Sequence, residues 1–194
     1  MAYPTVSAPY GLKPVNRVDG IAYAGQTRQI PFSSSQTAAV FFGDAVMIHT
    51  DGYLIKDTGT TAATPCGVFV GCQYVNSMGQ TVQSQYMPAN TTGAIAYVVD
   101  DPMAAFKVAV VSGTTVIASV GRAVVGSNMA LVQNAGSTTT GDSAVAVLST
   151  STNTTNTLPV RVIDVVPATA TGADAYVELI VKINTHQYNN TTGV

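Results

Sequence analysis

Residues 43–57, GDAVMIHTDGYLIKD, hold two short apolar runs on either side of an Asp-Gly pair. Asp51-Gly52 is a strong short-range signal for a β-hairpin, because a type I′ turn needs positive φ at both central residues. Side chains alternate along a strand, so Val46 and Ile48 would face the same side of this hairpin. The stretch therefore predicts antiparallel β structure.

The rest of the chain has the same character. Val and Thr are its two commonest residues, both are branched at Cβ and suit a pleated surface, and 17 Gly and 9 Pro interrupt the apolar runs. Short strands separated by turn residues are typical of an all-β sandwich or barrel. We expect further strands at 67–75, 81–87, 94–99, 106–111, 115–125, 129–133, 143–148, 159–166 and 175–184. We also expect one Asp-capped helical turn at 100–105 and an exposed polar loop at 149–157.

The first 38 residues show neither a helical nor a strand period. They contain four Pro and three of the eight basic residues of the chain. We interpret 1–38 as an extended N-terminal arm and 39–194 as a β-rich body, either one unit or two subdomains at about 39–113 and 114–194.

Two roles for the arm remain open at this point. It is either an irregular strand lying along its own domain or a tether that docks a neighbouring subunit. Tyr and Arg are favoured in the cores of protein interfaces. The tether hypothesis assigns partner binding to Tyr3, Tyr10, Lys13, Arg17 and Arg28.

The chain carries very little charge. Its 8 basic and 10 acidic residues make up 9% of the sequence, against roughly 25% in an ordinary soluble domain. A nearly neutral surface opposes association weakly and avoids the desolvation cost of charge at an interface, so we expect a homo-oligomer. The formal net charge of −2 offers no basic stripe for nucleic acid, and no apolar run is long enough for a membrane helix.

The two cysteines, Cys66 and Cys72, bracket the run GVFVG. In a continuous strand they would lie about 20 Å apart, whereas the Cα atoms of a disulfide must approach to about 7 Å. A bridge would need a sharp bend at Gly67 or Gly71. We therefore favour two small buried thiols.

One set of residues has the chain order of a trypsin-like catalytic triad: His49, Asp100 or Asp101, and Ser143. Ala144 stands where the glycine after the nucleophile is usual, and only about forty residues separate the acid from the serine. Because geometry defines a triad and order does not, we expect no enzyme here.

Metal and cofactor sites are also not expected. Cys66, Cys72, His49 and His186 could supply zinc ligands, but they form no tight Cys-x-x-Cys or His-x-x-x-His pair. Asp100-Asp101 could contribute to a calcium site, yet such a site needs several convergent oxygens, and capping is the simpler role.

Several segments resemble a family of small virion proteins in tailed phages of aquatic hosts, similar to capsid cement or decoration proteins. They are AYP at 2–4, APYGLKPV at 8–15, RQIP at 28–31, KDTG at 56–59, TPCGVFVGC at 64–72, AYVVDDP at 96–102 and HQY at 186–188. The hairpin with its Gly-Asp, its Asp-Gly turn and the following Pro-x-Gly-Val also resembles the small β module of such proteins.

The resemblance implies β-rich subunits, often trimers, that assemble in the host cytoplasm and bind the major capsid protein on the outer capsid surface of the virion. There they would stiffen the shell against the internal DNA pressure. The expected function is thus a structural cement protein without catalysis. A tail, fibre or adhesin module that binds host glycan is the alternative, although the absence of Trp from the chain speaks against a sugar site.

Overall fold

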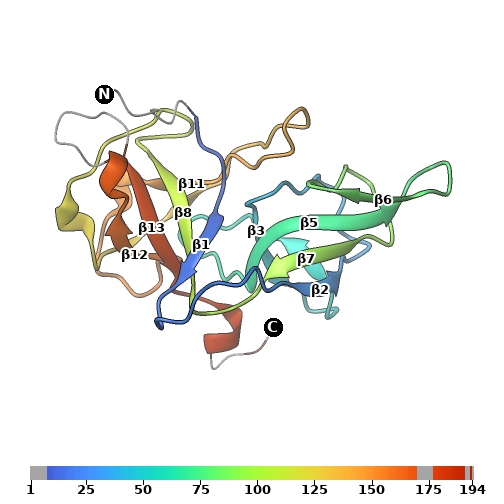
Figure 1. Ribbon diagram of the computed structural model, residues 1–194, viewed down its shortest axis with the longest axis horizontal. Coiled ribbons are helices and arrows are strands. Elements are labelled where there is room, and N and C mark those ends of the chain that lie inside the picture. Colours follow the sequence, from blue (N-terminus) through green and yellow to red (C-terminus); the bar gives the residue numbers. More distant parts are fainter. Residues whose placement is uncertain (1–7, 170–176, 191–192, 194) are drawn as a thin grey trace.

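The computed structural model describes residues 8–169, 177–190 and 193. Over these residues the chain forms β strands and short 3-10 turns, with no α-helix. The all-β expectation is confirmed. The strands form two sheets, one at each end of the molecule (Figure 1). Among the described residues there is no helix with the length and apolar character needed to cross a bilayer.

The first sheet has seven strands and is mixed and nearly closed, like a barrel. Its order is β10-β11-β8-β13-β12-β9, with β1 also paired to β8, and the β11–β8 pair is parallel. Its strands are β1 (Lys13–Arg17), β8 (Ala104–Val111), β9 (Asn128–Met129), β10 (Leu131–Val132), β11 (Ala146–Leu148), β12 (Val160–Val165) and β13 (Glu178–Ile183). Phe106, Leu131 and Leu179 lie in its core.

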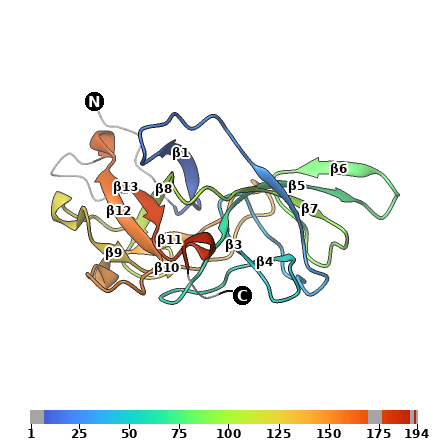
Figure 2. The same cartoon turned by 90° about the horizontal axis from the view of Figure 1, so that it is seen from below.

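The second sheet has six strands and is antiparallel. Its order is β2-β7-β5-β3-β4, and β6 pairs with the far part of β5 (Figure 2). Its strands are β2 (Arg28–Pro31), β3 (Ala45–Ile48), β4 (Leu54–Lys56), β5 (Gly67–Val75), β6 (Thr81–Ser84) and β7 (Ile95–Val99). The rings of Phe32 and Phe69 pack in its core, with centroids 5.9 Å apart.

Neighbouring residues of the second sheet lie in different cores. Val68 belongs to the core of the first sheet and Phe69 to that of the second, and Val99 and Val98 divide in the same way. This division follows from the two-residue period of a strand, which points successive side chains to opposite faces. One face of the second sheet therefore packs against the first sheet, and residues of both sheets contribute to one core.

The hairpin is confirmed, but its turn is of another type. β3 and β4 pair with Met47 opposite Ile55, and the N–H of Gly52 donates to the carbonyl of His49 at 2.9 Å. Of the two turn residues only Gly52, at φ +80°, has a positive φ. The loop is thus a three-residue connection that ends in a left-handed glycine, in place of a type I′ turn.

The other expected strands are mostly confirmed. The strand expected at 67–75 is β5 with the same bounds, and 94–99, 106–111 and 159–166 correspond to β7, β8 and β12. The prediction of a strand at 115–125 is wrong. Apart from an isolated bridge at Ile117, this segment is a loop with a 3-10 turn at Arg122–Val124. Its Ala118, Val120 and Val124 pack onto the first core from outside, which explains its apolar composition.

The helical turn expected at 100–105 is a β-turn. The N–H of Ala104 donates to the carbonyl of Asp101 at 3.0 Å, and β8 begins at Ala104. With no helix there, the aspartate is not a helix cap. Asp101 Oδ1 instead accepts the N–H of Met103 at 2.8 Å, within the turn.

The N-terminal segment, whose sequence shows no strand period, contains two strands. β1 pairs with β8 in the first sheet and β2 pairs with β7 in the second. Leu12 and Ile30 are buried, one in each core. The sequence hid these strands because Pro14 and Pro31 interrupt the pattern, yet both lie on edge strands, where proline is tolerated. Residues 8–38 therefore lie along their own domain, and the division of the body into subdomains stays a prediction.

Deleting residues 1–38 should abolish the cooperative thermal transition, because it removes a strand from each sheet and apolar side chains from both cores. As a milder change, Leu12→Ala should lower the free energy of unfolding by about 2–5 kcal/mol. The control is Ile21→Ala in the same segment, where the side chain is 60% exposed, and it should change stability by less than about 0.5 kcal/mol. A deletion variant that melts like the full chain would contradict this assignment.

Candidate functional site

The four residues assigned to partner binding that the structure describes, Tyr10, Lys13, Arg17 and Arg28, bind within their own chain. Tyr10 Oη donates to Glu178 Oε1 at 2.5 Å, and Glu178 lies on β13 with a side chain that is nearly buried. The ammonium groups of Lys13 and Lys107 each lie 5.5 Å from the centre of the Tyr10 ring. Burial, together with the hydrogen bond to the Glu178 carboxylate, raises the pKa of Tyr10 well above its usual range. Tyr10 thus anchors the segment to the first sheet.

The three cations of the segment pair with acids elsewhere in the fold. Lys13 lies 3.1 Å from Asp142, and Arg28 lies 3.1 Å from Asp100 and over the ring of Tyr188. Arg17 pairs with Asp101 and with Asp19. Tyr3, the fifth residue of this set, lies outside the described residues.

A close crossing of backbone segments holds the two sheets and the N-terminal segment together. Gly11, Gly43 and Ser143 meet there, and both glycines have positive φ, +81° and +92°. A Cβ at Gly43 would lie 2.9 Å from the N atom of Leu12 and 3.0 Å from the Cα of Gly11. We call this contact of Gly11, Gly43 and Ser143 the glycine junction.

Backbone hydrogen bonds join the residues of the glycine junction to neighbouring segments of the chain. The N–H of Leu12 donates to the carbonyl of Gly43 at 2.9 Å, and the N–H of Gly43 donates to the carbonyl of Phe69 at 2.8 Å. The N–H of Gly11 donates to the carbonyl of Val145 at 3.1 Å. Four segments far apart in the sequence, at residues 11–12, 43, 69 and 145, are therefore fixed at one point.

The buried carboxylate of Asp44 lies beside the glycine junction and binds Ser143. Asp44 has no exposed surface, and its Oδ1 accepts the hydroxyl of Ser143 at 2.6 Å. Its Oδ2 accepts the Nζ of Lys56 at 2.8 Å and the N–H of Phe41 at 2.9 Å. Ser143 Oγ also accepts the N–H of Val145 at 3.0 Å. A buried carboxylate needs such partners to offset its desolvation.

The triad arrangement is not formed. Ser143 is buried against Asp44, while Asp100 and Asp101 pair with arginines of the N-terminal segment. His49 Nδ1 lies 3.2 Å from Asp51 at the β3–β4 turn. Within the described ranges no hydrogen bond or ion pair joins His49, Ser143 and either aspartate.

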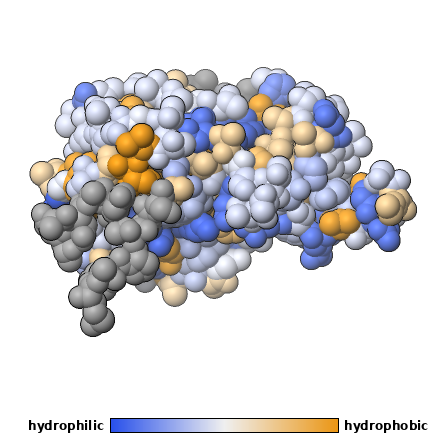
Figure 3. All heavy atoms as spheres, turned by 90° about the horizontal axis from the view of Figure 1, so that it is seen from above, coloured by the Kyte–Doolittle hydropathy of each residue, from blue (hydrophilic) through white to orange (hydrophobic). Residues whose placement is uncertain are grey.

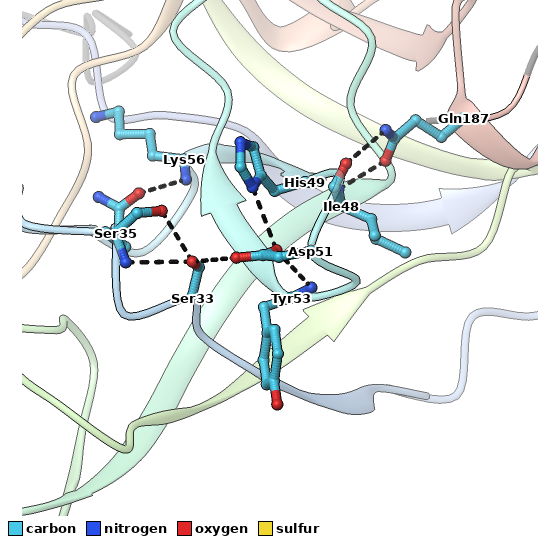
Figure 4. A network of polar contacts seen from close by, with 9 residues as sticks. Ser33, Ser35, Ile48, His49, Asp51, Tyr53, Lys56 and Gln187 are labelled. Atoms are coloured by element: carbon cyan, nitrogen blue, oxygen red, sulfur yellow. Dashed lines mark hydrogen bonds and ion pairs between the residues drawn. The ribbon is translucent and has the colours of Figure 1, made fainter.

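The β3–β4 turn is fastened by polar contacts from two sides (Figure 4). Asp51 accepts the hydroxyl of Ser33 at 2.5 Å and the N–H of Tyr53 at 3.0 Å, and these bonds hold the pKa of Asp51 below its usual range. The side-chain amide of Gln187 accepts the N–H of Ile48 at 2.8 Å and donates to its carbonyl at 3.1 Å. The segment after β13 is thereby tied to the second sheet.

No metal site is found in the part of the chain that the structure describes, since no three His, Cys, Asp or Glu side chains come together there. Cys66 and Cys72 are both buried free thiols, as expected. Burial raises the pKa of each to about 12. His186 is also buried, and desolvation lowers its pKa.

Comparison with known proteins adds no relative. No protein-family model matches the chain, and searches of curated proteins and of solved structures find no match. The functional argument therefore rests on the sequence and on the geometry described above.

Gly43→Ala should lower the free energy of unfolding by about 3 kcal/mol, because an L side chain is strained at this φ and its Cβ overlaps the Leu12 backbone. Gly52→Ala is the matched control: φ is +80°, but nothing lies within 4 Å of the added Cβ. It should cost only about 1 kcal/mol. Urea denaturation measures both, and equal losses would show that the junction is not tightly packed.

Both thiols should resist maleimide at pH 7.5 in the native protein, because a pKa of about 12 leaves almost no thiolate and burial blocks access. After denaturation without reductant, two labels per chain should add, as counted by intact mass. A mass two units below the reduced value in protein isolated under protection from oxidation would instead indicate a disulfide.

Proposed function

We propose that this protein is a capsid cement protein of a tailed phage, which binds the major capsid protein on the outer surface of the shell and stabilises it. The resemblance of its sequence to such proteins suggests the class. The low charge and the all-β fold support a role in permanent contacts between proteins.

The observation that carries the proposal is how the few charges are used. Six of the eight basic side chains form ion pairs inside the chain: Lys13, Arg17, Arg28, Lys56, Lys107 and Arg122. A seventh, Arg161, donates to the side chain of Asn128 at 3.0 Å. The surface offered to a partner consists mostly of hydroxyls, amides and scattered apolar side chains. Exposed charges such as Arg122 and Arg28, with side chains 73% and 54% exposed, are already paired within the chain.

The surface fits extended contact better than a single deep pocket. On the face drawn in Figure 3, apolar residues form small patches separated by polar ones. Protein interfaces have much the same mixture of apolar and polar area, with charge depleted from their centre. Binding energy in a cement protein would be spread over such a surface, with no dominant ion pair.

Recombinant protein added to particles that lack it should bind, and the affinity should depend little on salt. Raising NaCl from 50 to 500 mM should change Kd by less than about threefold, because screening acts on exposed charges and few are available. A binding assay by sedimentation with the particles measures this. Binding to host glycan and not to particles would favour the tail or adhesin alternative, and a steep loss with salt would contradict a neutral interface.

The isolated protein should be a homo-oligomer, and a trimer is the expected form. Light scattering should then give about 60 kDa, three times the 19.9 kDa chain. A mass of about 20 kDa at micromolar concentration, together with monomeric density on the particle, would refute the assembly part of the proposal.

A further inference from the structure

One hairpin stands apart from the rest of the fold. β5 extends beyond the body of the second sheet and turns into β6, and the pair projects at the end of the molecule opposite the first sheet (Figures 1 and 2). Among the described strands, β6 pairs with β5 and with no other. Its second edge therefore has no strand beside it.

The hydrogen-bond register shows which groups this edge offers. The N–H of Asn76 donates to the carbonyl of Gln80 at 2.9 Å, and the register continues with Tyr74 opposite Val82. In an antiparallel pair, every second residue turns both backbone groups toward its partner. Val82 thus faces β5, and Thr81 and Gln83 direct their N–H and C=O groups outward.

This edge is short, at four residues, but it lacks the charge and the proline that normally discourage strand addition. No Asp, Glu, Lys, Arg or His occurs from residue 58 to residue 99, and no Pro lies between residues 66 and 87. Two other edge strands are protected: β1 carries Lys13, Pro14 and Arg17, and β2 carries Arg28 and Pro31. Charge and proline on an edge are the usual defence against pairing with another chain. The chain protects those two edges and leaves β6 open.

The hairpin is also ordered by its own contacts. Asn76 Oδ1 accepts the N–H groups of Met78 and Gln80 at 2.9 and 3.0 Å, and Gly79 has a φ of +76°. At the tip, Met78 is 82% exposed. A strand that is already in its bound conformation loses little entropy on pairing.

We propose that the outer edge of β6 pairs with a strand of a second copy of this chain. An open, uncharged edge is a template for pairing with another chain. The partner that is always present is another copy, and with a formal net charge of only −2 per chain the copies repel each other weakly. The contact does not depend on what the assembled protein binds.

The test places charge on the edge and measures the oligomer. Thr81→Lys/Gln83→Lys should lower the mass by light scattering to that of the monomer. The far-UV circular dichroism of the fold should be kept, because both side chains are exposed and the backbone groups of residues 81 and 83 do not pair with β5. Thr138→Lys/Thr139→Lys adds the same charge in an exposed turn and should leave the oligomer intact. Gln83→Pro, which removes one outward N–H, should act like the double lysine variant.

Hydrogen exchange provides a second readout that does not require a variant. The amides of Thr81 and Gln83 should be protected in the native oligomer and exchange fast in the lysine variant. The proposal is overturned if the native chain is a monomer, if the lysine variant keeps the native mass, or if these two amides exchange freely in the native protein.

Discussion

The close approach of Gly11 to Gly43 is the constraint on which the structure depends. The N-terminal segment, the residues just before β3 and the segment that leads into β11 cross there, with both glycines at positive φ. Asp44, beside the crossing, binds Ser143 and Lys56 and so ties the same segments by their side chains. Because backbone packs directly on backbone, no residue with a Cβ fits without moving one of the segments.

This construction explains why so few charges remain for a partner. Lys13, Arg17 and Arg28 tie the N-terminal segment to acids on two loops, the one before β8 and the one before β11, and these acids are thereby neutralised. The tether hypothesis predicted that these same side chains would bind a neighbouring subunit; in the structure they have partners within the chain. A role for them in partner binding stays a prediction. The proposed interface is instead the uncharged surface of the folded body.

The sequence predicted those parts of the fold that depend on local pattern. β5 and the β3–β4 hairpin were recognisable because apolar runs and an Asp-Gly pair mark them directly. β1 and β2 were missed because proline breaks the local pattern, and only pairing with β8 and β7 makes these segments strands. The bond from Ser143 to Asp44 joins residues 99 positions apart, and Gly11 and Gly43 show no local sign that they meet. Such contacts arise from tertiary packing, which no sequence window contains.

The proposal assigns this chain to the virion of a tailed phage, and its most direct test is electron microscopy of such virions. The cement proposal predicts density for this two-sheet fold in regular positions on the outer shell, where capsid subunits meet, with copies in contact with one another. Density confined to the tail or its fibres would contradict the proposal, and so would a shell on which the protein is absent.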